Sequence, residues 1–90
     1  MSIKTKKQEL PSWFRGEIYT EGAVVKNPFS GEEYKLNKIE LSMYDFVKGA
    51  EIALELGIIK DGVPKVIKEM HDGLYWFRKN NPEAYMILLD

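Results

Sequence analysis

Apolar residues recur at helical spacing through residues 37–57, and this pattern predicts the helix around which the rest of the chain packs. At about 100° per residue, one broad face collects Ile39, Met43, Phe46, Val47, Ala50, Ala53 and Leu54. Leu41, Ile52 and Leu56 point roughly the other way. A narrow face is expected to be exposed to solvent; it consists of Glu40, Tyr44, Lys48, Glu51 and Glu55. A helix that is apolar on two sides is buried between two layers, which are either other parts of the chain or a second copy of it.

The ends of this helix carry capping residues. Asn37 followed by Glu40 fits a capping box, and Gly57 fits a left-handed residue just past the last turn. Gly49 lies inside the helix, where glycine costs about 1 kcal/mol relative to alanine. It marks either the close approach of a neighbouring backbone or a tolerated weak point.

The segment before the helix predicts a small antiparallel meander of two or three strands, over residues 17–20, 23–26 and 33–36. Gly22 is placed to supply a positive φ for the first reversal, and residues 27–31 (NPFSG) form the second. Tyr34 and Leu36 alternate with polar residues and share a half-buried face.

After the helix, residues 58–63 form a connection, and Pro64 suits the first position of a second helix. Its apolar side consists of Val63, Val66, Ile67, Met70, Leu74 and Phe77, and Glu69 is expected on the opposite, solvent side. Gly73 is expected to kink or split this helix. Trp76 falls among charged residues, so it is either covered by another segment or contacts a partner. Asn81 with Pro82 starts a short last helix over residues 82–90, which carries Tyr85, Leu88 and Leu89 among its apolar side chains.

These elements predict an α+β fold: a small N-terminal antiparallel β-meander packed on a central helix, followed by a second long helix and a short C-terminal one. Ninety residues suffice for one domain. We expect residues 11–90 to form it and residues 1–10, with Lys4, Lys6 and Lys7, to form a flexible tail.

Composition narrows the class of partner. The net charge is −1 with both signs interspersed, which disfavours a dedicated binder of nucleic acid or of anionic membranes. The longest apolar run, residues 85–89, is far below the roughly 20 residues of a spanning helix. The chain has no cysteine, which rules out disulfides and thiolate chemistry and fits an intracellular setting. A soluble protein is expected.

Candidate catalytic chemistry is sparse, and we expect neither an enzyme nor a bound cofactor. His71 is the only histidine, without a second ligand at matching helical spacing, so we interpret it as a residue bordering the core. Glu69 and Asp72 have the ExxD spacing of one half of a magnesium site, but the other half is absent upstream. A glycine-rich phosphate loop and a nucleophile pattern are also absent.

A helix-turn-helix is the alternative, based on residues 53–58 followed by Val63 and Val66. In that interpretation Lys65 and Lys68 contact DNA. Pro64 in the would-be recognition helix, the long connection and the acidic preceding helix count against it.

Three stretches, residues 27–31 (NPFSG), 41–46 (LSMYDF) and 76–85 (WFRKNNPEAY), together resemble a family of small proteins of unknown function from marine tailed phages and ocean metagenomes. The resemblance covers residues 11–90. It implies a phage origin and a location in the host cytoplasm or in the virion, and it carries over no activity, ligand or catalytic residue.

The sequence therefore predicts a small non-catalytic interaction protein that forms a homo-oligomer and that also binds a host or virion protein. The residues expected to contact partners are Leu41, Ile52, Leu56, Trp76, Tyr85, Leu88 and Leu89.

Overall fold

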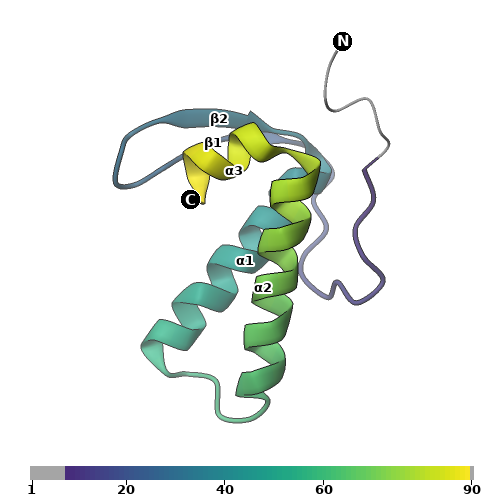
Figure 1. The fold of residues 1–90 in the computed structure, drawn as a ribbon, viewed down its shortest axis with the longest axis vertical. Helices are drawn as coiled ribbons and strands as arrows, with labels where there is room; N and C mark the ends of the chain where they lie inside the picture. Colours follow the sequence, from purple (N-terminus) through teal and green to yellow (C-terminus); the bar gives the residue numbers. More distant parts are fainter. Residues whose placement is uncertain (1–7, 90) are drawn as a thin grey trace.

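The computed structural model describes residues 8–89, which form a two-stranded sheet and three helices (Figure 1). The elements are β1 (Ala23–Lys26), β2 (Glu33–Leu36), α1 (Lys38–Leu56), α2 (Val63–Asn80) and α3 (Pro82–Leu88). This arrangement confirms the predicted α+β fold. The two strands pair antiparallel, with Ala23 opposite Leu36 and Lys26 opposite Glu33.

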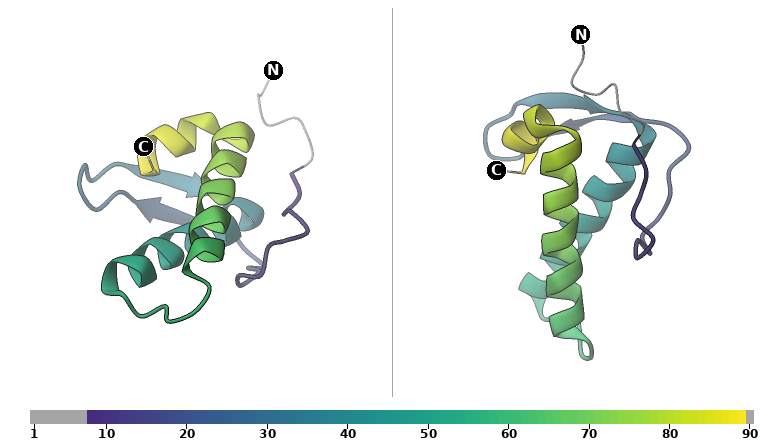
Figure 2. Two further views of the ribbon diagram at one scale, coloured as in Figure 1. Left: turned by 60° about the horizontal axis from the view of Figure 1, so that its bottom comes forward. Right: turned by 45° about the vertical axis from the view of Figure 1, so that its right-hand side comes forward.

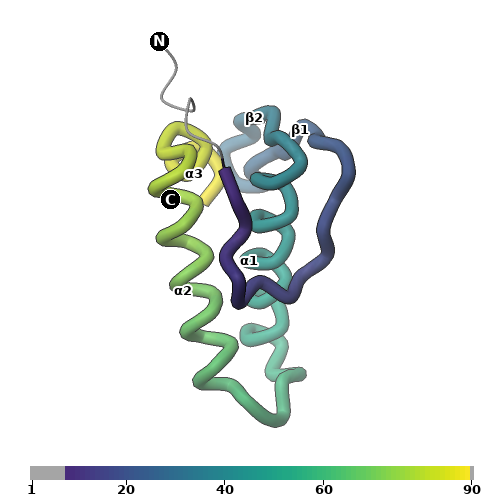
Figure 3. Tube along the Cα trace, turned by 90° about the vertical axis from the view of Figure 1, so that its right-hand side faces the viewer, coloured from purple at the N-terminus to yellow at the C-terminus, as the bar shows by residue number. Residues whose placement is uncertain are grey.

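The helices α1 and α2 run side by side in opposite directions, and the sheet and α3 lie across one end of this pair (Figures 1 and 2). We call this end, residues 38–47 of α1 and 69–80 of α2, the sheet end. Residues 48–68, which include the connection between the helices, form the loop end. The segment before β1 runs beside both helices and then turns back to β1 (Figure 3).

Local signals set the helix boundaries as expected. The Asn37 side chain accepts a hydrogen bond from the Glu40 backbone N–H (2.8 Å), and the Glu40 carboxylate accepts one from the Asn37 backbone N–H (3.0 Å). Gly57 closes α1 with a φ of 67°, a left-handed conformation that glycine adopts without steric cost. The Asn81 side chain caps α3 at Ala84 N–H.

The core lies at the sheet end. Its buried apolar side chains are Leu36, Met43, Val47, Phe77, Ala84 and Leu88. The sequence suggested that Gly73 would kink or split α2, but the helix runs unbroken from Val63 to Asn80 and is not split there. A Cβ atom at this position would come within 2.8 Å of Val47 Cγ2 and 3.1 Å of Met43 Sδ, so the missing side chain is what allows α1 and α2 to approach closely. Gly49, in contrast, has no neighbour within 4 Å of a Cβ position among the described residues, which removes the close-approach explanation.

Residues 17–20 do not form the predicted third strand. The Tyr19 backbone N–H donates to the Ser42 hydroxyl of α1 (2.9 Å), so this stretch is held by a helix and not by a neighbouring strand. The prediction for Gly22 was also wrong, since its φ is not positive. A Cβ there would lie 2.1 Å from the Leu36 carbonyl oxygen, so glycine is needed because two backbones meet.

Two glutamates expected in solvent are buried. Glu40 is fully buried, and its Oε2 accepts hydrogen bonds from the Gln8 and Asn81 side-chain amides, both at 2.9 Å. Glu69 is buried against Arg15, whose guanidinium donates to it through Nε (3.0 Å) and Nη2 (2.8 Å). The helical periodicity alone placed both carboxylates in water, because it contains no information about the polar side chains that the N-terminal segment brings to them.

The predicted tail of residues 1–10 overlaps the packed structure. Residues 1–7, with the three lysines, lie outside the described residues, but Gln8 bonds to Glu40 and Leu10 packs against the core. Contacts with the helices therefore begin before Pro11.

Candidate protein-interaction surfaces

The seven residues predicted to contact partners occupy different environments. Leu88 is 3% exposed and belongs to the core, so it offers little surface to a partner. Leu41, Trp76, Tyr85 and Leu89 are half-buried and pack against the core. Only Ile52 and Leu56 are largely exposed, at 50% and 67%. The seven side chains therefore do not form one surface.

The loop end of the helical pair has no buried residue between positions 48 and 68. Besides Ile52 and Leu56, the exposed large apolar side chains there are Ile58 and Ile67. Ile52 and Leu56 are four residues apart on α1, so their side chains lie one turn apart on the same face. Single exposed apolar residues are ordinary, but two on one helix face with further ones at the same end of the molecule are a feature of contact sites.

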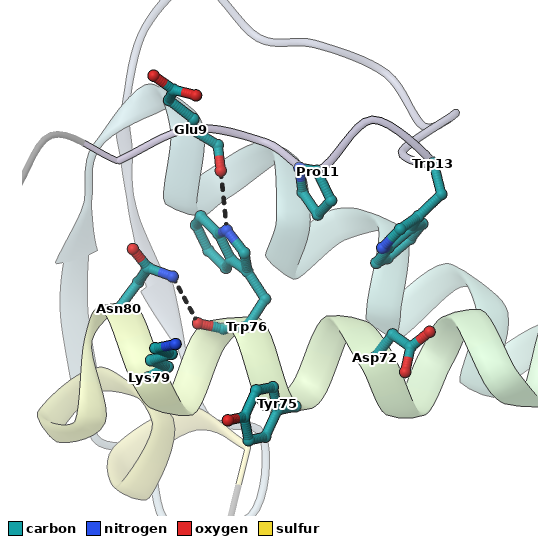
Figure 4. Close-up of a pocket in the computed structure, with 8 residues that line it drawn as sticks. All are labelled: Glu9, Pro11, Trp13, Asp72, Tyr75, Trp76, Lys79 and Asn80. Carbon is teal, nitrogen blue, oxygen red and sulfur yellow. Dashed lines mark hydrogen bonds between the residues drawn. The ribbon is translucent and has the colours of Figure 1, made fainter.

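Trp76 is covered by the N-terminal segment, one of the two outcomes that the sequence allowed. Its indole N–H donates to the Glu9 carbonyl oxygen (2.9 Å), as Figure 4 shows. Its ring also meets Phe77 edge-on, with 6.0 Å between ring centroids. The polar atom of this tryptophan is thus satisfied within the chain.

Beside Trp76 lies an open groove of about 460 Å³ between the N-terminal segment and α2 (Figure 4). Apolar rings line it from both sides, with charged groups at its rim; the lining residues are Glu9, Pro11, Trp13, Asp72, Tyr75, Trp76, Lys79 and Asn80. Its charged residues are Glu9, Asp72 and Lys79, and Asp72 is paired with Lys68, so the groove carries no excess charge of either sign.

A second, smaller pocket of about 230 Å³ lies where α2 meets α3. Its lining residues are His71, Leu74, Tyr75, Arg78 and Tyr85. The half-buried Leu74 and Tyr85 are also part of the apolar packing, whereas His71 and the cationic Arg78 are exposed. The pocket combines apolar side chains with a basic rim.

The loop between β1 and β2 presents the most exposed aromatic ring among the described large apolar residues, Phe29, at 94%. Sequence analysis treated residues 27–31 only as a reversal and missed this side chain. The available signal was an aromatic residue at the tip of a turn rich in proline and glycine, where no strand or helix can bury it.

Asn27 organises this loop. Its side-chain oxygen accepts hydrogen bonds from the backbone N–H groups of Phe29 (2.8 Å) and Ser30 (3.2 Å), and its amide donates to the Ile87 carbonyl oxygen of α3 (2.8 Å). Backbone bonds join Asn27 to Glu32 and Gly31. The ring of Phe29 is thus held out on a loop that is already ordered and tied to a helix.

Two ion pairs and one phenol hydrogen bond change the pKa values of the side chains that form them. The hydrogen bond from Arg15 is the main cause of the lowered pKa of the Glu69 carboxyl, opposed by burial and helped by the charge of Arg15. Lys68 pairs with Asp72 (2.7 Å), which raises the pKa of the lysine. Burial is the main cause of the raised pKa of the Tyr34 phenol, which donates to Glu83 (3.1 Å).

The two lysines of the helix-turn-helix alternative, Lys65 and Lys68, are exposed in the first turns of α2. Residues 57–62 separate α1 from α2, and the helices run side by side, whereas helix-turn-helix units cross at about 90–120° after a turn of about 3–4 residues. Lys68 is already paired with Asp72. The geometry offers no specific support for DNA contacts.

In the part of the chain that the structure describes, no group of three or more histidine, aspartate or glutamate side chains could hold a metal ion. Across residues 8–89, no helix is both long and apolar enough to cross a membrane. No family model, curated protein or solved structure matches the chain.

Proposed function

We propose that this chain is a small, non-catalytic interaction protein that associates with itself. The observation that carries the proposal is the loop end of the α1–α2 pair, where no residue between 48 and 68 is buried and Ile52, Leu56, Ile58 and Ile67 face solvent. A surface of this kind at one end of a molecule is typical of a site that another protein covers.

The energetic argument concerns the two residues on α1. Fully burying an isoleucine or leucine side chain stabilises a folded or assembled state by about 1.5–3 kcal/mol. In the single chain, Ile52 and Leu56 are 50% and 67% exposed, so much of this stabilisation is available to an oligomer. Two copies that meet at their loop ends cover four such side chains from α1 alone. Helices α1 and α2 of each copy can then form a bundle with those of the partner, in which apolar stripes face inward.

The resemblance of three stretches to phage proteins supports a proposal about where the protein acts, but it says nothing about how the copies associate. We place the protein in the host cytoplasm, with the virion as a second location and a host or virion protein as a further partner.

Sedimentation velocity across a concentration series from micromolar to millimolar tests the proposal. We expect a mass that rises with concentration to that of a defined oligomer. The double variant Ile52→Ser with Leu56→Ser should shift the equilibrium toward the monomer, because it removes apolar area that only the oligomer buries. The matched control is Ile18→Ser, which changes an exposed isoleucine of the N-terminal segment. A wild-type chain that stays monomeric throughout the series would refute self-association.

A further inference from the structure

We propose that self-association is made specific by the β1–β2 loop: Phe29 of one copy inserts into the α2–α3 pocket of a second copy, lined by Leu74, Arg78 and Tyr85. This inference rests on the proposed self-association and adds a second contact, at the sheet end of the molecule, to the contact proposed at the loop end. Four lines of observation support it: the shape of the loop, the size of the pocket, the charges of the two surfaces and the exclusion of other occupants.

The loop has the features of a preformed anchor. Phe29 is 94% exposed, so the described residues 8–89 of its own copy leave the ring uncovered. The hydrogen bonds of Asn27 to Phe29, Ser30 and Ile87 hold the turn in one shape before any partner arrives. Little conformational entropy is then lost on binding, and a rigid aromatic side chain that fills a pocket is the usual source of binding energy at protein interfaces.

The pocket matches this ring in size and character. An apolar cavity of about 150 Å³ accepts a benzene molecule, so an open pocket of about 230 Å³ can take a phenyl side chain. Leu74 and Tyr85 supply apolar contacts. Tyr75 adds a second ring, which an incoming aromatic side chain can meet in an offset or edge-on arrangement.

The charges of the two surfaces are complementary. Residues 26–33 carry Lys26, Glu32 and Glu33, a net charge of −1. The pocket has Arg78 and His71 at its rim and no acidic residue in its lining. Opposite charges at the rim align two partners and suppress wrong orientations. The acidic Glu32 beside the loop tip therefore suits the neighbourhood of Arg78.

Charge also argues against another receiving site for the loop and against a lipid surface as its partner. In the larger groove beside Trp76, Asp72 is paired with Lys68 and Glu9 is balanced by Lys79, so its charges do not attract an acidic loop as the rim with Arg78 does. An anionic lipid surface attracts basic segments, which the loop is not. A second copy is the partner that brings both the ring and the acidic flank, and with two-fold symmetry each copy can give one loop and receive another.

The first test compares Phe29→Ala with Val24→Ala, a control that shortens another exposed apolar side chain of the same hairpin. Sedimentation equilibrium should show association weakened about tenfold or more for Phe29→Ala, as for an anchor residue, and changed less than about twofold for Val24→Ala. Because both side chains are exposed, thermal melts of the two variants should match that of the wild type under monomeric conditions.

The second test exchanges charges between the two surfaces. Glu32→Lys and Arg78→Glu should each weaken association by about threefold, and the chain that carries both changes should regain wild-type association within about twofold. Restoration is expected only if the two positions face each other across the interface.

The outcomes separate this inference from the proposed function. A wild-type oligomer whose Phe29→Ala variant dissociates like the wild type overturns the loop contact and leaves self-association standing, as does a charge exchange without restoration. A wild-type chain that is monomeric at millimolar concentration overturns both.

Discussion

At the sheet end of the α1–α2 pair, Met43, Val47 and Phe77 are buried beneath the strands, α3 and the N-terminal segment, whereas the loop end buries none of its residues. The same two helices run through both ends, and both ends carry apolar side chains at helical spacing. The difference comes from what lies over them, because a pair of helices cannot exclude water from its outer faces without a third layer. Stability is therefore concentrated at the sheet end, and the helical faces of the loop end are left without a covering layer.

The largest contrast between the two ends should appear when one side chain is truncated at each. Phe77→Ala at the sheet end should lower the free energy of unfolding by about 3–5 kcal/mol, because it removes a fully buried ring and leaves a cavity. Leu56→Ala at the loop end should change it by less than about 0.5 kcal/mol in the monomer. Urea unfolding at low protein concentration measures both, and equal losses would contradict the comparison.

A smaller loss is expected for Asn81→Ala, also at the sheet end. This change removes the cap of α3 and one of the donors to the buried Glu40 carboxylate. The expected cost is about 2 kcal/mol, from the lost cap and the lost charge-assisted hydrogen bond. Asn80→Ala next to it serves as the control, since among the described residues the side chain of Asn80 donates to Trp76 O within its own helix. An Asn81 variant no less stable than the Asn80 variant would contradict the structural role of the buried amide.

Replacing a glycine by alanine should change the free energy of unfolding in opposite directions in the two helices. Gly73→Ala places a methyl group within 2.8 Å of Val47 and should destabilise the protein by about 1 kcal/mol, the overpacking cost less the gain in helix propensity. Gly49→Ala, where the space is open, should stabilise it by about 0.5–1 kcal/mol. Thermal or urea unfolding of both variants provides the measurement, and the same sign for both would contradict the close packing of α1 against Gly73.

The smallest effect is expected for the ion pair between Arg15 and Glu69, which makes the free energy of unfolding depend on pH in the acid range. The pKa of Glu69 is lowered in the folded state by Arg15, so the pair stabilises the fold at pH values above the ordinary glutamate pKa of about 4.3. This contribution is lost as the pH falls through the lowered pKa of the folded state. The stability difference between the wild type and Glu69→Gln should therefore shrink from neutral pH to about pH 2, which urea unfolding at several pH values can follow. A difference that stays constant with pH would show that the carboxylate charge contributes nothing.

Much of the fold follows from local signals. The capping box at Asn37, the left-handed Gly57, and Pro82 after Asn81 fix where helices begin and end through bonds within a few residues. The alternation at Tyr34 and Leu36 likewise predicted β2 and its buried face. The candidate interaction site was less predictable: periodicity correctly found Ile52 and Leu56 on an outer face, but it could not show that Leu88 is covered or that Phe29 is presented by an ordered loop.

What the sequence by itself determined is the three helices, the two strands that form and most of their boundaries, because each depends on backbone geometry and on hydrogen bonds between near neighbours. The tertiary structure alone decided that Glu40 and Glu69 are buried, that residues 17–20 lie along α1, and that the loop end is left uncovered. Each of these depends on a partner far away in the chain, such as Gln8 and Asn81 for Glu40 or Arg15 for Glu69. The local pattern of apolar and polar residues cannot identify partners that are distant in the sequence.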